Sequence, residues 1–230
     1  MPSRAESKRI QNFRFTIAGE IPRFPNNKET LRQLRESPLA SVLIYYHHWI
    51  VRYVRPRPRT VDIEATVTSD SRWARLEGRI AKFLDKVKTG ADLTPHLSVE
   101  PHTRGYTPAS SRVGPTVDRW ADKDFLLNVM GYHHFHLGET IGPNGVAVRT
   151  ADVLFAKVAR ERFIAIGIFG HSVFSRARTA TDEMTFERER LWRTFTEHST
   201  RGLPPGSIYI PASITTSGHS LQLAHLPLCQ

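Results

Sequence analysis

The segment GYHHFHLGET, residues 131–140, places three histidines within four positions. Imidazole has an ordinary pKa of about 6.5, so it can both accept and donate a proton at neutral pH. Because side chains alternate between the two faces of a strand, His134 and His136 share one face, about 7 Å apart. The other face carries His133, Phe135 and Leu137. The two apolar residues indicate a core on their side, so His133 is drawn toward it and the other two histidines face away.

Two further strands are predicted at 153–159 (VLFAKVA) and 163–169 (FIAIGIF), and the polar turn RER between them is typical of an antiparallel hairpin. The second strand has an unbroken β-branched face made of Ile164, Ile166 and Ile168. If that face is the core side, the opposite face carries smaller residues and forms a shallow floor that ends at His171.

These strands are expected to gather four basic side chains on one concave surface: His134, His136, Lys157 and His171. Arg149, in the preceding loop, is expected at the rim. Cleavage of RNA without a metal needs a base for the 2′-hydroxyl, an acid for the leaving 5′-oxygen and a cation for the developing charge. The favoured interpretation is therefore a metal-independent endoribonuclease that uses no cofactor.

In this interpretation the five residues have separate roles. His134 and His136 act as base and acid in either order, Lys157 or Arg149 binds the phosphate, and His171 orients the others or serves as a third acid or base. Two alternatives stay open. His134, His136 and His171 could instead hold zinc or another divalent metal, as an H-x-H pair with a third histidine can. The histidines could also be ordinary residues of a non-catalytic nucleic-acid-binding module.

The charge distribution favours a polyanionic partner. The chain has 32 Lys and Arg against 22 Asp and Glu, a net charge of +10. The first sixty residues hold twelve of the basic residues and four Glu, so +8 of this charge lies there. A basic stripe attracts RNA or other nucleic acid at long range, although an acidic protein partner is the alternative.

Several function classes have no support in the sequence. Phosphate-binding glycine motifs, GxSxG and HExxH do not occur, and the single cysteine, Cys229, excludes an internal disulfide framework. No apolar run approaches the ~18 residues of a membrane-spanning helix, and no secretory apolar segment follows the N-terminus. We therefore expect a protein of the cytosol with no membrane partner.

The remaining elements predict an α+β fold, in which a helical, basic N-terminal part packs on an antiparallel sheet with a late amphipathic helix. We expect a part at 1–117 with a long loop at 91–117, and a sheet part at 118–230, or one continuous domain. Helices are predicted at 28–36, from residue 39, at 71–88, at 118–130 and at 182–198, after an irregular arm at 1–27. Further strands are predicted at 61–67 and as a pair in the C-terminal tail.

LLNVMGYHHFHLGET, followed by LFAKVARERFIAIGIFGHSVF, resembles uncharacterised bacterial proteins that carry an HHxHLG segment. This resemblance covers about residues 118–200. At the level of layout alone, helices that lead into an antiparallel meander with a distal histidine resemble the RelE-like ribonuclease toxins. The resemblance implies an RNA-cleaving toxin or defence effector of the cytosol, held by an antitoxin or inhibitor protein.

Overall fold

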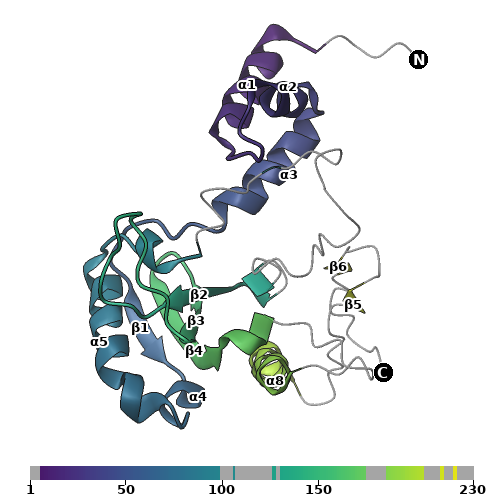
Figure 1. The fold of residues 1–230 in the computed structure, drawn as a ribbon. Coiled ribbons are helices and arrows are strands. Elements are labelled where there is room, and N and C mark those ends of the chain that lie inside the picture. The colour runs from purple at the N-terminus through teal and green to yellow at the C-terminus, as the bar shows by residue number, and fades with distance from the viewer. Residues whose placement is uncertain are drawn as a thin grey trace, which may run out of the picture.

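The computed structural model describes residues 6–98, 106, 126–127, 130–174 and 185–204, together with the backbone of 213–214 and 220–221. These residues form a helical unit followed by a four-stranded sheet that lies between helices (Figure 1). The α+β class, the helical N-terminal part and the late helix are confirmed.

The helical unit consists of α1 (Lys8–Glu20), α2 (Lys28–Glu36) and α3 (Leu39–Ile50), and it stands at one end of the molecule (Figure 1). Its own small core consists of the buried residues Ala18, Ile21, Leu34 and Val42. Both predicted helices are present here. Ser37 ends α2 by donating its hydroxyl to the carbonyl of Gln33, and α3 begins after Pro38 without a side-chain cap.

The prediction of an irregular arm over residues 1–27 is wrong for Lys8–Glu20, which is helical. Ser7 caps this helix by accepting the N–H of Ile10. Of its side chains only Ala18 is fully buried, while Ile10 and Phe13 are exposed. The helix therefore does not bury the continuous apolar stripe on which periodicity arguments depend.

The sheet has the strand order β1-β4-β3-β2. Its strands are β1 (Thr60–Ile63), β2 (Tyr132–His136), β3 (Asp152–Val158) and β4 (Arg162–Gly170). The predicted β3–β4 hairpin is confirmed, and β2 pairs antiparallel with β3. β1, however, runs parallel to β4, so the sheet is mixed and the expectation of a purely antiparallel sheet is wrong. β1 is also shorter than predicted, because a helical turn, α4 (Ala65–Thr68), follows it.

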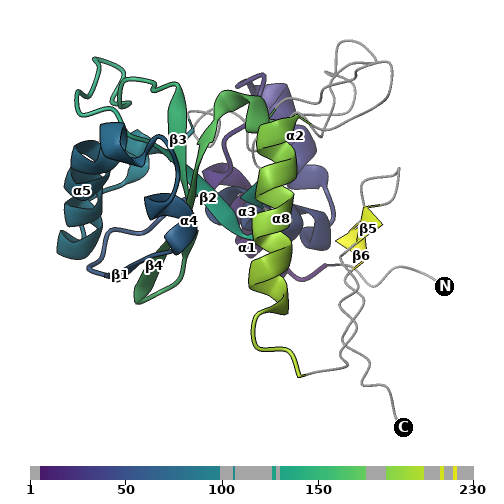
Figure 2. The same cartoon turned by 90° about the horizontal axis from the view of Figure 1, so that it is seen from below.

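Helices cover both faces of the sheet. α5 (Trp73–Thr89) packs on one face and α8 (Phe186–Thr200) on the other (Figure 2). The apolar stripe of α5 is buried as its periodicity predicts, and it consists of Leu76, Ile80, Phe83, Leu84 and Val87. Gly90 ends α5 with a φ of 77°, a left-handed conformation that glycine adopts without strain.

A bulge in β4 overturns the predicted face of the isoleucines. Phe155 of β3 pairs with Gly167 and the next residue, Ala156, pairs with Ala165, so Ile166 is an extra residue in β4. The alternation therefore reverses there: Ile166 packs on the α8 side, whereas Ile168 packs on the α5 side. Both faces are buried, and the expected shallow floor of small residues does not exist.

The expected boundary at 117/118 lies outside the described residues, as do most of the predicted 118–130 helix and of the 91–117 loop. Within the described part, β1 and α5 share one core with β2, β3 and β4. A second, two-stranded sheet of β5 (Ser213–Ile214) and β6 (Ser220–Leu221) confirms a strand pair in the tail. Among the helices in the described ranges, none is both long and apolar enough to cross a membrane.

Candidate functional site

Three histidines form a row on the α8 side of the sheet. β2 places His134 and His136 on the same face, as predicted, with ring centroids 6.2 Å apart. His171 begins a short 3-10 helix, η3 (His171–Phe174), directly after β4, and its ring centroid lies 5.4 Å from that of His136. The sequence prediction that these three side chains meet is therefore matched by the geometry. We call them the histidine row.

Burial differs sharply along the histidine row. His134 is 7% exposed and His136 is 2% exposed, whereas His171 is exposed to solvent. His134 lies among aromatic rings, with centroids 4.8 Å from Phe174 and 5.9 Å from Phe155. The two strand histidines therefore do not line an open electropositive hollow, and His171 is the member that a large substrate can reach.

His136 is fixed through its backbone by a further histidine. His96, in the 3-10 helix η1 (Thr94–His96), donates from Nδ1 to the carbonyl of His136 at 2.8 Å. Its Nε2 accepts from Lys86 Nζ at 3.0 Å, and burial holds the pKa of His96 below its ordinary value. A neutral His96 thus fastens the end of β2 to α5.

The two predicted phosphate-binding cations are not in the histidine row. Lys157 pairs across the sheet with Tyr132, so it lies two residues along the strand from His134 and about 13 Å from His136 by strand spacing. Arg149 donates to the carbonyl of Leu97 at 3.3 Å, outside the sheet.

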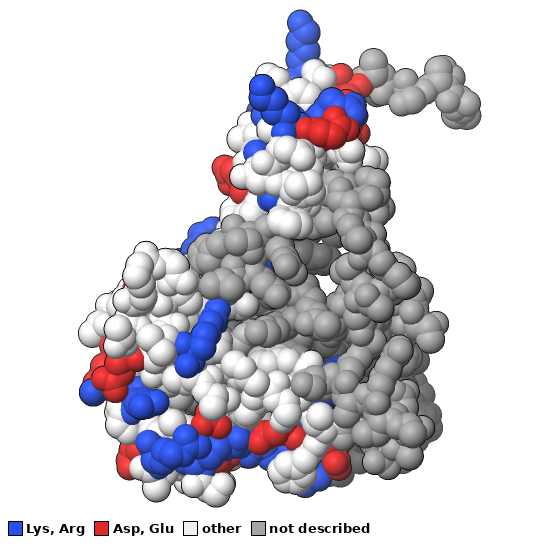
Figure 3. Space-filling view, viewed as in Figure 1, with Lys and Arg blue, Asp and Glu red and all other residues white. Residues whose placement is uncertain are grey.

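A charged cluster lies at the same end of the sheet as His171. It joins the start of α5, the start of α8 and the end of β4, and it consists of Asp70, Arg72, Arg75, Asp152, Glu187 and Arg190. Arg72 and Arg190 both donate to the carbonyl of Ile168. Three carboxylates match three arginines, and we call this cluster the clamp. Figure 3 shows basic and acidic side chains interspersed along this end of the molecule.

Asp70 is the centre of the clamp, and its side chain is 1% exposed. Burial alone would raise the pKa of Asp70, but hydrogen bonds from Arg72 and Arg190 outweigh it and hold the pKa well below its usual range. By donating to Asp70, the guanidinium of Arg72 has its own pKa raised. Asp70 and Arg72 are therefore both ionised at neutral pH.

A polar chain at the other end of α8 was not predicted. The hydroxyl of Tyr132 lies 3.4 Å from His198 Nδ1, and His198 Nε2 lies 4.0 Å from Glu64. Arg201 donates to both carboxylate oxygens of Glu64, which holds the pKa of Glu64 below its usual value. Burial lowers the pKa of His198, so that its charge at neutral pH is small. No local sequence signal joins these residues, because they come from three distant segments.

A basic pocket on the other side of β2 was also missed. It holds about 840 Å³ between the end of α3, residues 53–59, the start of β2 and the β3–β4 turn. Its basic lining residues are His47, Arg55, Arg57, Arg59, His133 and Arg160. We call it the arginine pocket. The alternation RPRPR was a sequence signal for it, because proline spaces the arginines and fixes the backbone.

His133 faces the arginine pocket side of β2, as its position beside Phe135 predicts. Its Nε2 donates to the carbonyl of Val51 at 3.1 Å. Burial, with a smaller effect from the positive charge of Arg59, lowers the pKa of His133 to about 4. His133 is therefore neutral at physiological pH, and it is not a proton shuttle there.

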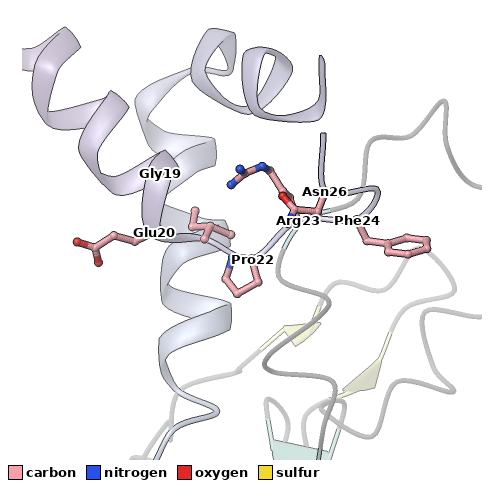
Figure 4. A pocket seen from close by; sticks show the side chains of 7 residues that line it. Gly19, Glu20, Pro22, Arg23, Phe24 and Asn26 are labelled. Atoms are coloured by element: carbon pink, nitrogen blue, oxygen red, sulfur yellow. The ribbon is translucent and has the colours of Figure 1, made fainter. Parts of the chain in front are cut away.

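A second pocket, of about 360 Å³, lies in the turn after α1 (Figure 4). Glu20 and Arg23 give its lining one charge of each sign, and Figure 4 shows Glu20 and Phe24 pointing away from each other. This mixed lining has no preference for an ion of either sign.

Nothing in the described ranges brings three His, Cys, Asp or Glu side chains close enough to share a metal ion. The predicted metal alternative at His134, His136 and His171 stays a prediction. Comparison with known proteins found no matching family model, no matching curated protein and no matching solved structure. The resemblance to RelE-like toxins likewise stays a prediction.

Proposed function

We propose that the chain is a metal-independent endoribonuclease of the cytosol, in which His171 is the catalytic residue that contacts RNA. The observation that carries this proposal is the histidine row itself: one exposed imidazole lies 5.4 Å from a buried one. A buried ring that packs against an exposed ring can fix the orientation of the exposed ring. A group that transfers protons needs such a fixed orientation. His136 is therefore a positioning residue. The sequence alone predicted His136 as the acid or base, and His171 as an orienting residue or a third acid or base.

The reaction needs one proton to move. The neutral ring of His171 takes the proton of a 2′-hydroxyl, and that oxygen attacks the adjacent phosphorus. The bond from phosphorus to the 5′-oxygen breaks, and the protonated ring returns its proton to this oxygen. The products are a 2′,3′-cyclic phosphate and a 5′-hydroxyl end.

A cation is needed for the charge that develops on the phosphate. Arg75 has a side chain that is 59% exposed, and one of its nitrogens binds Asp152 at 2.9 Å. Asp152 pairs with Gly170, the residue before His171. We therefore assign to Arg75 the phosphate-binding role that was expected of Lys157 or Arg149 from the residue pattern.

The test is cleavage of RNA by purified protein without a histidine tag, with and without EDTA. His171→Ala should slow cleavage by about 10²- to 10⁴-fold, which is the usual contribution of one proton-transferring group. His48→Ala is the matched control, because His48 is an exposed histidine on α3. His136→Gln should lower the rate less and shift the pH profile of the remaining activity.

Other outcomes would contradict this function. Loss of cleavage in EDTA would favour the metal alternative at the histidine row. Equal cleavage rates in the His171→Ala and His48→Ala variants would show that His171 takes no part in the reaction. A wild-type protein that cleaves no RNA would favour the non-catalytic nucleic-acid-binding module. A chain that cleaves RNA must be restrained in the cell that makes it, so an antitoxin or inhibitor protein belongs to the same proposal.

A further inference from the structure

The arginine pocket is lined by one sign of charge. Arg55, Arg57, Arg59 and Arg160 contribute to its wall, and no Asp or Glu is among the described residues that line it. The carboxylate beside it is Glu161, which lies 3.2 Å from Arg57 and 3.3 Å from Arg160. Four guanidinium groups thus face one carboxylate, and a concave surface of one sign concentrates counter-ions.

Arg59 is a buried cation without a carboxylate partner among the described residues. It is 8% exposed, and its guanidinium donates to the carbonyls of Ala159, Arg57 and Arg55 at 3.0 to 3.2 Å. These three bonds use three of the five N–H groups of the side chain. Carbonyl dipoles orient the group but leave its full positive charge, and burial and the charge of Arg57 both lower the pKa of Arg59.

The segment that carries these arginines is held rigidly. Pro56 and Pro58 fix two of its backbone angles. A Cβ on Gly90 would lie 2.5 Å from Pro58 N, so the segment sits directly against the end of α5. The backbone N–H of Arg59 also donates to Val87 at 3.3 Å. A site that is ordered before its ligand arrives loses less entropy on binding.

We propose that the arginine pocket binds the phosphate groups of a single RNA strand, with a base of that strand against Tyr53. Guanidinium groups match the geometry of phosphate oxygens and can bind them in pairs. The ring of Tyr53 is held edge-on by Trp49, with centroids 5.5 Å apart, so the pocket has an aromatic surface beside its charges. Aromatic rings beside arginines are typical of sites for single-stranded nucleic acid.

This inference deepens the proposed function and rests on it for the identity of the ligand. His133 and His134 are successive residues of β2 and face opposite sides, so the arginine pocket and the histidine row lie on the two sides of one strand. β2 is an edge strand of the four-stranded sheet. A strand of RNA held in the arginine pocket would pass around the edge of the sheet and then along it, because His171 lies at the other end of the β3–β4 hairpin.

The experiment measures binding apart from cleavage. The probe is a labelled 2′-O-methyl oligoribonucleotide of about 12 nucleotides, which has no 2′-hydroxyl to react, and fluorescence anisotropy follows binding over a range of salt concentrations. The variant is Arg55→Ala/Arg57→Ala/Arg160→Ala, which spares the buried Arg59. The control removes three exposed arginines elsewhere: Arg32→Ala/Arg79→Ala/Arg193→Ala.

The pocket variant should bind about 10- to 100-fold more weakly at low salt, and the slope of log K against log salt should become shallower by about 2. The control variant should change both quantities much less. Equal losses in the two variants would mean that total charge alone matters, and would overturn the proposal. Competition by polyglutamate as strong as that by RNA would overturn it in favour of an acidic protein.

Two further comparisons distinguish an RNA strand from a free phosphate as the ligand, and the arginine pocket proposal from the ribonuclease proposal. A mononucleotide or inorganic phosphate that competes as well as the strand would reject a strand as the ligand. Normal RNA binding by the pocket variant, with cleavage lost in His171→Ala, would reject the pocket and keep the ribonuclease. Binding that depends on the pocket, in a wild-type protein that cleaves nothing, would keep the pocket and reject the ribonuclease.

Discussion

Two arginine clusters lie at opposite ends of the β3–β4 hairpin and are held in opposite ways. In the clamp, Arg72, Arg75 and Arg190 meet three carboxylates. In the arginine pocket, Arg59 meets three carbonyls, and Arg57 and Arg160 share Glu161. Apart from the exposed Arg75, the first arrangement satisfies its charges internally and stabilises the fold, whereas the second leaves positive charge for a ligand. The residue type alone therefore does not indicate the role.

The largest expected effect tests the clamp. Asp70→Asn removes a buried carboxylate that accepts from Arg72 and Arg190, so two cations lose their partner. We expect the free energy of unfolding to fall by about 3–5 kcal/mol, as for other broken buried ion pairs. Urea unfolding measures this. Asp62→Asn breaks an exposed pair with Arg162 and is the matched control, with little expected change. Similar values for both variants would mean that the clamp is not structural.

The next effect uses pH to detect the burial of His133 beside the arginine pocket. The pKa of His133 is lowered to about 4 in the folded chain, against about 6.5 when unfolded. The unfolded chain therefore binds a proton first as the pH falls, and stability is lost between pH 6.5 and pH 4. The loss attributable to His133 is about 3 kcal/mol.

His133→Gln should flatten the unfolding free energy over this pH range, measured by urea denaturation at several pH values. The contribution of Asp70 lies in a different window. Because the pKa of Asp70 is depressed, its stabilisation is present at neutral pH and is lost only as the pH falls below about 4. A His133 variant with the wild-type slope between pH 6.5 and pH 4 would show that Arg59 and burial do not act on this ring.

Much of the fold follows from local patterns. The stripe of α5, the cap at Gly90 and the β3–β4 hairpin could be predicted because each depends on residues close in sequence. The parallel pairing of β1 with β4 joins residues about a hundred positions apart, and no local pattern encodes it. The bulge at Ile166 could not be predicted, because isoleucine continues to occupy every second position across it. The face of the sheet nevertheless changes there.

The candidate site likewise has features that follow from local patterns and features that depend on long-range contacts. Strand alternation predicted that His134 and His136 share a face and that His133 faces the other. Their burial was not predictable, since it depends on Phe155 and Phe174 and on the cover that α8 gives to this side. The misplacement of Lys157 came from register: it shares the face but pairs with Tyr132, away from His136. The sequence shows the arginines of the pocket only as part of the net charge. Their position beside the β3–β4 turn depends on contacts between residues about a hundred positions apart.

The smallest expected effect comes from a substitution that should strengthen RNA binding at the arginine pocket. Glu161→Gln removes the carboxylate that Arg57 and Arg160 share, so their charges become available to a phosphate. RNA affinity at low salt should rise by about 2- to 5-fold with a slightly steeper salt dependence. The backbone carbonyl of Glu161 still accepts from Thr60, so β1 keeps its attachment.

Glu197→Gln is the matched control for this substitution, because it removes one exposed carboxylate from α8, outside the arginine pocket. Anisotropy with the 2′-O-methyl probe compares the two variants. A tighter complex for Glu161→Gln alone would locate the effect at the arginine pocket, since both variants change the net charge equally. Equal gains would show that RNA responds to the charge of the whole chain, and the contrast between a satisfied and an unsatisfied arginine cluster would then have no functional meaning.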